Sequence, residues 1–330
     1  MSTINTIRTG QSIEPASILP DAVEAGKLLN RPPTGRRRSH SIKNYFSVSL
    51  LHLVLGAISL VMVLPFVWML LTSLKPLGEV ASTDWIPGSV DTVQKVGVPV
   101  PRNYLDVFDY NNPDINHRGI QFARFYWNSI FVAAWATFLQ VMTSAMAAFS
   151  FARLQWPGRD RVFLLYLSTM MLPGLVMMIP NFQIMISLGL VDTFTGLIVP
   201  AAFSAFGTFL LRQFMLSIPK SLDEAAEIDG AGKWRLFWEI ILPLSRPGLI
   251  TLTIFTFMGN YNSFFWPLVM LRSEAKYTLP IGLLFFDSSQ GQATHLLMAA
   301  VTMSVVPMIV LFVLLQKYLV KGIQLGAVKG

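Results

Sequence analysis

The chain has 330 residues, of which 53% are hydrophobic and only 13% are charged, whereas an ordinary soluble domain has about 25% charged residues. This composition, with a mean hydropathy of +0.54, argues against a soluble globular enzyme and against a disordered chain. The sequence has no cysteine, isolated histidines and neither of the common glycine-rich nucleotide-binding motifs, so it indicates no metal centre and no nucleotide pocket of its own.

Residues 1–43 contain no apolar secretory segment and are rich in Pro, Ser, Gly, Thr and Arg, which predicts a mobile arm. Counting lysine and arginine on alternate sides of the spans predicted below gives eighteen on the side of both termini and seven on the other. Because positive residues accumulate on the cytoplasmic side, both termini are expected in the cytoplasm. The same asymmetry explains the net charge of +7 without a nucleic-acid partner.

Six runs without Asp, Glu, Lys or Arg approach or exceed the about 20 apolar residues that a helix needs to cross a bilayer. In the hydrocarbon region every backbone polar group must be paired internally, so each run is expected to be helical. Buried helices of a soluble protein are the weaker alternative, because such helices average about 11–12 residues and keep a polar face. We therefore predict an all-α membrane protein with six transmembrane helices, at about residues 47–74, 127–152, 162–186, 193–211, 247–271 and 296–318. These spans lie in a transmembrane domain of residues 44–330.

Prolines and charges refine these spans. The third is expected to kink or end near Pro180–Met185, and Pro200 is expected to kink the fourth. The outer connection, residues 75–124, reads as an irregular lobe with one short helix near Asn103–Tyr110. No ionisable residue lies deep in a span, which argues against a self-powered secondary transporter. The energy for any transport would then come from a partner.

The connection of residues 212–246 reads as two short helices. Ser221 and Glu224 have the spacing of a capping box at the start of the first, and Gly230 can adopt the left-handed turn that ends it. The second is predicted from Lys233 to Leu242, where Pro243 would end it. One stripe of that helix would hold Trp234, Phe237, Trp238 and Ile241.

The first of these short helices is too short to be stable alone in water. Its small residues Ala225 and Ala226 are rimmed by Glu224, Glu227 and Asp229, a pattern that suits a docking element for a partner. An amphipathic hairpin that lies on the membrane surface explains the pattern equally well.

The fifth span contains amide and aromatic side chains close together. Amides can pair with hydroxyl groups, and aromatic faces can cover sugar rings, so this segment is a candidate solute pathway. Its residues are Asn260, Tyr261, Asn262, Phe265 and Trp266. The alternative is helix–helix contacts with an interfacial aromatic belt. Asn181 and Gln183 in the third span form a second, weaker candidate.

The loop resembles the EAA loop of permease subunits of ABC importers at all of that motif's fixed positions, which are Glu224, Ala225, Ala226, Gly230, Ile240, Leu242 and Pro243. Further segments resemble the carbohydrate branch, the second permease of maltose and glycerol-3-phosphate systems. They include Asn128-Ser129, Phe151-Ala152-Arg153, Ile228–Ala231 and Leu242–Pro247. The resemblance covers Asn44–Gly330, and the long N-terminal arm departs from it.

The resemblance implies a type I ABC importer permease fold in the bacterial cytoplasmic (inner) membrane, with residues 75–124 on the periplasmic side. It implies four partners: a second homologous permease, two cytoplasmic ABC ATPase subunits and an extracytoplasmic solute-binding protein. ATP and Mg²⁺ would be bound by the ATPases, and this chain would bind no cofactor and catalyse nothing. Residues 212–246 would be the coupling loop, with Glu224, Ala225, Ala226 and Gly230 as its contact core and Gln324–Gly330 as a second contact.

Three alternatives remain beside a sugar permease. The solute could be a glycerol phosphate, a peptide or an amino acid, or the chain could be a channel that conducts without ATPases. A membrane-embedded enzyme is the third, and it would need convergent acids, bases or metal ligands that the sequence does not offer.

Overall fold

The computed structural model describes residues 42–76, 79–80, 102–109, 121–286 and 294–327, with side chains at 48–76, 79–80, 102–108, 121–286 and 294–317. The described residues form helices and their connections and contain no β-strand. The chain divides into two compact units, Met1–Met62 and Val63–Gly330. The predicted mobile arm, much of the 75–124 connection and the side chains of Gln324–Gly330 lie outside the described residues.

The helices follow one another along the chain with short connections. They are α2 (Ile42–Ser73), α4 (Arg102–Asp109), α5 (Phe122–Arg153), α6 (Arg159–Ser168), η2 (Thr169–Met171), α7 (Gly174–Ser187), α8 (Phe194–Ala201), α9 (Ala205–Ser217), α10 (Ser221–Ile228), α11 (Lys233–Arg235), η3 (Leu236–Ile241), α12 (Leu242–Leu244), α13 (Arg246–Tyr261), α14 (Phe265–Met270), η4 (Glu274–Lys276), α15 (Leu279–Gly282), η5 (Leu283–Phe286) and α16 (Thr294–Ala327). The short helix predicted near Asn103–Tyr110 is α4, so that prediction is confirmed.

Three described helices, α2, α5 and α16, are long and apolar enough to cross a membrane by themselves. Three bent pairs raise the number to as many as six if each pair is one span. The all-helical class is thus confirmed, and six is the upper limit that the described residues allow.

The third predicted span is broken at a different proline from the one expected. The two halves meet at an angle of 100° between Met171 and Gly174, because Pro173 is in an extended conformation (ψ 127°) directly before α7. Pro180 lies inside α7 and does not end it, so no kink is found there, whereas the expected end of the span near Met185 agrees with the end of α7 at Ser187 to within two residues. The bend expected at Pro200 is present, since α8 and α9 are inclined at 43° across a short break.

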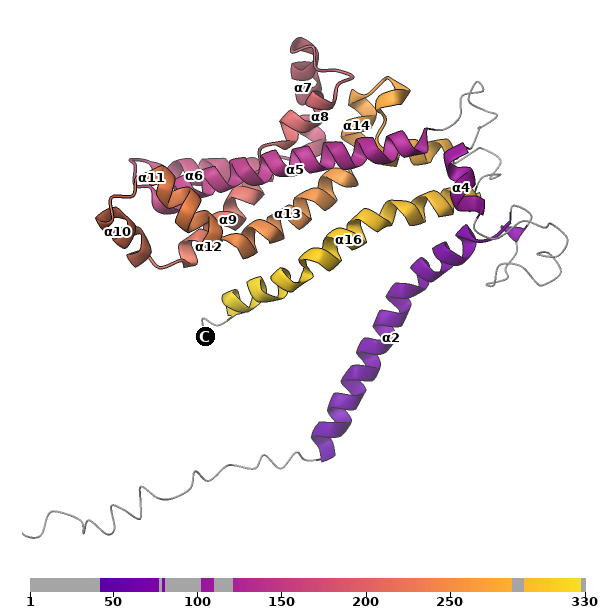
Figure 1. The fold of residues 1–330 in the computed structure, drawn as a ribbon, viewed down its shortest axis with the longest axis horizontal. Coiled ribbons are helices and arrows are strands. Elements are labelled where there is room, and N and C mark those ends of the chain that lie inside the picture. Colours follow the sequence, from indigo (N-terminus) through magenta and orange to yellow (C-terminus); the bar gives the residue numbers. More distant parts are fainter. Residues whose placement is uncertain (1–41, 77–78, 81–101, 110–120, 287–293, 328–330) are drawn as a thin grey trace, which may run out of the picture. The chain divides into compact units, whose positions relative to one another are not determined.

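Helix α5 is the centre of the second unit. It packs most extensively against α9 and α13, and also against α8 (Figure 1). Its 32 residues include neither glycine nor proline, so nothing in its sequence interrupts the helix. The approach of α9 to α5 depends on Gly207, where an added Cβ would lie 2.6 Å from Oγ of Ser144.

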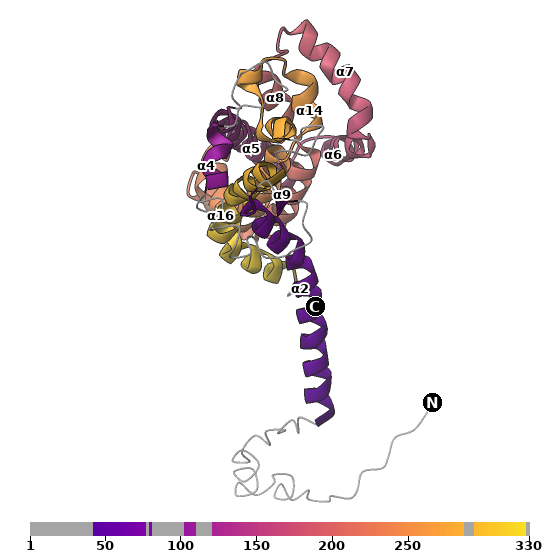
Figure 2. The ribbon, with the colours of Figure 1, turned by 90° about the vertical axis from the view of Figure 1, so that its right-hand side faces the viewer.

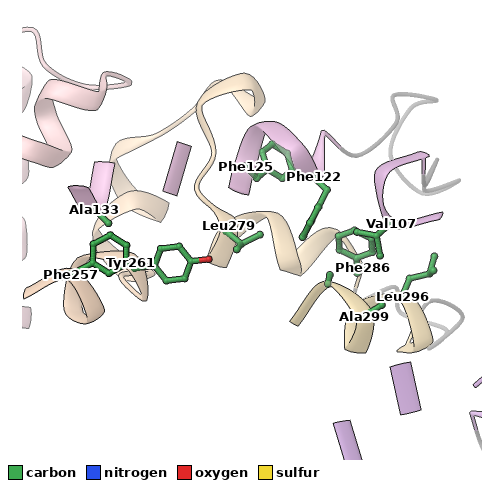
Figure 3. Packing of buried hydrophobic residues seen from close by; sticks show 11 residues of the cluster. Val107, Phe122, Phe125, Ala133, Phe257, Tyr261, Leu279, Phe286, Leu296 and Ala299 are labelled. Atoms are coloured by element: carbon green, nitrogen blue, oxygen red, sulfur yellow. The ribbon is translucent and has the colours of Figure 1, made fainter. Parts of the chain in front are cut away.

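The N-terminal end of α5 packs into an aromatic cluster. Phe122 meets Phe286 edge to face, with ring centroids 6.1 Å apart, beside Val107 of α4 (Figure 3). Phe257 and Tyr261 of α13 stack at 5.7 Å in the same cluster. Burying such rings is strongly favourable, so this cluster fixes α4, α13, η5 and α16 around the start of α5.

A second cluster surrounds the C-terminal end of α5, and we call it the α5 C-terminal cluster. Its buried members are Ala145, Ala148, Phe149, Ala152, Leu211, Met215, Ala226, Leu236, Phe237, Ile241 and Leu252. They come from α5, α9, α10, η3 and α13, so this cluster holds the 212–246 loop against the transmembrane helices. Figure 1 shows α10 to α12 at the end of α5 that lies opposite α4.

Candidate functional site

The helix α10 begins without the predicted capping box. Lys220, rather than Ser221, occupies the N-cap position, and no side chain caps the helix. Lys220 has helical backbone angles (φ −69°, ψ −22°), and its carbonyl accepts from the backbone N–H of Glu224 at 3.1 Å. Ser221 is therefore the first helical residue, and the capping-box prediction is wrong.

The end of α10 agrees with the sequence. Gly230 has φ +76°, the left-handed conformation that favours glycine. Its N–H donates to the carbonyl of Glu227 at 3.0 Å, and the N–H of Ala231 donates to that of Ala226 at 2.8 Å. These two bonds form a Schellman motif, which satisfies the free carbonyls at the helix end. The short helix is thereby closed sharply.

The two alanines of α10 face in different directions. Ala226 is buried in the α5 C-terminal cluster, where its small side chain lets α10 approach α5. Glu224 and Ala225 are exposed, and so is Ile228, a residue that is 87% exposed. We call Glu224, Ala225 and Ile228 the outer face of α10. Sequence reasoning assigned Ile228 no role, although an apolar residue among acidic neighbours was a usable signal.

The second half of the loop is not the regular helix that was predicted. Residues Leu236–Ile241 form a π-helix, which continues into α12 and past Pro243 to Leu244. The predicted stripe is only partly buried: Phe237 and Ile241 are buried, whereas Trp234 and Trp238 are exposed, with their rings 6.3 Å and 5.1 Å from that of Phe237. The motif positions Ile240, Leu242 and Pro243 are half-buried, and Ile240 and Leu242 pack against the α5 C-terminal cluster.

A separate cavity of about 500 Å³ lies where α5, α7, α8, α13 and α14 meet. Helices α8 and α14, which both contribute lining residues, lie next to each other in both ribbon views (Figures 1 and 2). The cavity is lined by Ser129, Val132, Gly174, Leu175, Met178, Asn181, Leu197, Pro200, Ala201, Asn260, Ser263, Phe264, Phe265, Trp266, Pro267 and Thr278. Hydroxyl, amide and indole groups thus meet aliphatic and aromatic surfaces in one space, as in many ligand pockets.

Three of the five predicted pathway residues line this cavity. They are Asn260, Phe265 and Trp266. Asn260 donates through Nδ2 to the carbonyl of Thr256 at 3.0 Å, and the Nε1–H of Trp266 donates to the carbonyl of Gly196 at 3.2 Å. The side-chain oxygen of Asn260 makes no hydrogen bond within the described part of the chain, so it can accept one from a ligand.

The other two predicted residues lie elsewhere. Tyr261 is buried in the aromatic cluster, and its hydroxyl donates to the carbonyl of Ser304 at 3.0 Å. Asn262 is exposed at the C-terminal end of α13 and does not line the cavity. Of the weaker pair, Asn181 lines the cavity and Gln183 does not.

Three hydroxyl residues of the cavity were not predicted, namely Ser129, Ser263 and Thr278. Thr278 is 4% exposed, and its hydroxyl has no hydrogen-bond partner in the described residues. None of the described residues that line the cavity is charged. The arrangement can therefore hold a neutral, hydroxyl-rich molecule and offers no counter-charge to an ion.

An ionised side chain holds the α7–α8 connection against the segment that follows α14. Asp192 accepts from the Ser273 hydroxyl, from the backbone N–H groups of Arg272 and Ser273 at 3.0 Å each, and from Nζ of Lys276 at 3.0 Å. The hydrogen bond from the Ser273 hydroxyl is the largest cause that holds the pKa of Asp192 far below its usual value, and the other donors add to it. The contacts join the connection between α7 and α8, two helices that line the cavity, to the segment that leads to the lining residue Thr278.

The chain matches the family described as binding-protein-dependent transport system inner membrane component over residues 140–325. It is 38% identical over 212 residues to the arabinooligosaccharides transport system permease protein AraQ of Halalkalibacterium halodurans, covering 63% of this chain and 76% of the relative. AraQ of Bacillus subtilis is 31% identical, covering 83% and 92% respectively. The sn-glycerol-3-phosphate transport system permease protein UgpE of Yersinia enterocolitica is also 31% identical, covering 72% and 88%.

One chain of the crystal structure of a bacterial ABC transporter involved in the import of the acidic polysaccharide alginate has a similar fold. The TM-score is 0.71 at 24% identity, over 84% of this chain and 98% of the other. This likeness concerns the fold of the helices.

Proposed function

Because this chain belongs to the family of binding-protein-dependent transport system inner membrane components, we propose that it is the permease subunit of an ATP-driven importer for a neutral sugar or oligosaccharide. It forms half of the pathway through the bacterial cytoplasmic membrane, and a second, homologous permease forms the other half. Two ATPase subunits bind ATP and Mg²⁺, and a soluble binding protein delivers the solute from outside.

The distribution of charge supports one orientation. Eighteen lysine and arginine residues fall on the side of the termini and of the 212–246 loop, against seven on the other side. On the positive-inside principle, α10 then faces the cytoplasm, where the ATPases are. The Asp192 contacts face the exterior.

One observation carries the coupling role. A short, sharply closed helix exposes an apolar side chain, Ile228, beside Ala225 and Glu224, while its opposite side is held in the α5 C-terminal cluster. A large apolar residue that is 87% exposed beside the acidic Glu224 and Glu227 is suited to a protein partner. We assign that partner as an ATPase subunit, which pushes α10 when it closes on ATP. The conformation of α10 is maintained by other residues of the same loop, namely Gly230, Ile240, Leu242 and Pro243.

The cavity supports a neutral carbohydrate. Hydroxyl groups of a sugar can pair with the side-chain amide of Asn260, and Phe265 and Trp266 offer aromatic faces. A glycerol phosphate is the second candidate, because one relative is named for it. A phosphate group would call for a positive side chain, and the described lining residues include none.

The proposal is tested by reconstituting the permease pair, the ATPases and the binding protein in vesicles. We expect uptake of a neutral sugar that requires both ATP and the binding protein, with the sugar first identified by thermal shift of the binding protein against a sugar panel. Solute flux through vesicles that lack the ATPases would identify a channel instead. Uptake of glycerol phosphate in preference to any sugar would select the second candidate.

A further inference from the structure

Arg153, the last residue of α5, connects the ends of three helices. Its Nη1 donates to Oδ2 of Asp223, in the first turn of α10, at 3.0 Å. Its Nη2 donates to the backbone carbonyls of Met215 at 2.5 Å and Ile218 at 2.9 Å, at the C-terminal end of α9. The planar guanidinium, with five N–H donors in a fixed geometry, can direct bonds to all three acceptors at once.

This contact differs from an ordinary surface ion pair. The side chain of Arg153 is 2% exposed and that of Asp223 is 17% exposed, whereas Asp160, the partner of nearby Arg159, is 69% exposed. A buried charge that loses its partner is strongly unfavourable, while an exposed pair contributes little. The ends of α5 and α9 also carry the negative pole of the helix dipole, which favours a cation there.

Apolar packing alone does not hold α10 along this side. A cavity of about 600 Å³ separates part of α10 from the end of α5, and both Arg153 and Asp223 line it. Ala226 is the member of α10 that reaches the α5 C-terminal cluster. The bond from Arg153 to Asp223 therefore supplies a directed link where the van der Waals contact is incomplete.

Helix α5 extends from the Arg153–Asp223 hydrogen bond to the cavity of about 500 Å³ described above, which we call the sugar cavity. Ser129 and Val132 line the cavity, and Arg153 lies at the other end of the same uninterrupted helix. Twenty-four residues at 1.5 Å each give a separation of about 36 Å along the axis. A displacement applied to the end of α5 is thus carried to the cavity wall.

We propose that Arg153 is a positioning residue that fixes α10 to α5 and α9, so that motion of α10 reaches the sugar cavity through α5. The proposal rests on the coupling role assigned to α10 above. It predicts that the bond is needed for transport to follow ATP hydrolysis, and not for the ATPase to bind.

The test compares Arg153→Gln and Asp223→Asn in the complete reconstituted importer with the matched control Arg159→Gln. Three quantities are measured: ATPase co-purification, sugar uptake per ATP hydrolysed, and amide hydrogen exchange of Ser221–Ile228. We expect the two test variants to keep the ATPases, to lose about tenfold in uptake per ATP and to exchange the α10 amides about tenfold faster. Arg153→Lys keeps the positive charge but not the planar guanidinium, so its uptake per ATP and its amide exchange should be intermediate. Arg159→Gln should match the wild type in both.

Unchanged uptake per ATP together with unchanged exchange in Asp223→Asn would overturn the proposal. That variant decides the question if Arg153→Gln fails to insert, because it leaves the buried arginine bound to the α9 carbonyls. A failure of the coupling role itself looks different: wild-type α10 would then gain no protection from exchange when the ATPases bind.

Discussion

The hydroxyl oxygen of Ser129 accepts a hydrogen bond from the backbone N–H of Leu279 at 2.7 Å, and both residues are at most 2% exposed. The neighbouring Asn128 donates through Nδ2 to the carbonyls of Ala275 and Tyr277, at 3.0 Å each. Helix α5 therefore holds the segment that places Thr278 in the cavity wall. A shift of α5 moves that wall with it.

Two asparagines that lie two residues apart in the sequence allow a direct test of whether the cavity binds the transported sugar. Asn260 lines it and Asn262 does not. Asn260→Ala should raise the KM for uptake about tenfold, because a hydrogen bond to the sugar is lost, whereas Asn262→Ala should leave KM unchanged. The measurement is the concentration dependence of sugar uptake in reconstituted vesicles. Equal effects of the two substitutions would remove Asn260 from the pathway.

The turn after α10 can be tested at two glycines that differ only in backbone conformation. Gly230 has φ +76° and Gly232 has φ −68°, and an added Cβ would meet no atom within 4 Å at either. Gly230→Val should cost about 1–2 kcal/mol, because a β-branched residue disfavours positive φ. We expect uptake to be abolished with membrane insertion intact, and Gly232→Val to transport normally. Normal uptake by Gly230→Val would mean that the shape of α10 is not needed.

If the outer face of α10 is the docking surface, substitutions on it should weaken binding of the ATPase subunit. Ile228→Ser should weaken ATPase binding about tenfold or more through loss of a buried apolar anchor, and Glu224→Lys should weaken it through charge reversal. Leu222→Ser is the control, because Leu222 is one turn from the buried Ala226 and is much less exposed, at 39%, than Ile228, at 87%. Binding is measured by titrating ATPase subunits onto the purified permease pair. A complex that stays intact with both outer-face substitutions would place the docking surface elsewhere.

The hydrogen bonds to Asp192 predict how the stability of the folded protein depends on pH. Because the folded pKa is depressed, the stabilisation is present above the unfolded value of about 3.9 and is lost as pH falls below it, towards the folded pKa. Asp192→Asn, which tolerates the positive φ of 58° at this position, should lower the thermal midpoint by about 2–4 °C at pH 7. The difference should be constant from pH 8 to pH 5 and should narrow below about pH 4. A difference that changes between pH 8 and pH 5 would show that another group titrates.

Features that depend on local composition could be predicted from the sequence. The helical class, the short helix α4 and the positive φ of Gly230 follow from apolar runs and glycine chemistry, without knowledge of distant contacts. The loop motif also marks the segment that carries α10. Its role in coupling is still a prediction.

Features that depend on tertiary packing could not be predicted from the sequence. The π-helix of Leu236–Ile241 breaks the period of 3.6 residues on which the aromatic stripe was based. Tyr261 and Asn260 are adjacent in sequence but point to the aromatic cluster and to the cavity respectively, a distinction made by neighbouring helices. Arg153 and Asp223 are 70 positions apart, so their contact could not be read from either segment alone.

The absence of cysteine makes one labelling experiment direct. Ile228→Cys introduces the single thiol of this chain on the outer face of α10, and a reagent with one thiol-reactive and one photoreactive end is applied to inverted and to right-side-out vesicles that contain the complete importer. We expect the thiol to crosslink to an ATPase subunit, and a membrane-impermeant reagent to reach it from the cytoplasmic side alone. Labelling from the exterior, or a thiol that never crosslinks to an ATPase subunit while transport proceeds, would contradict the coupling role of α10.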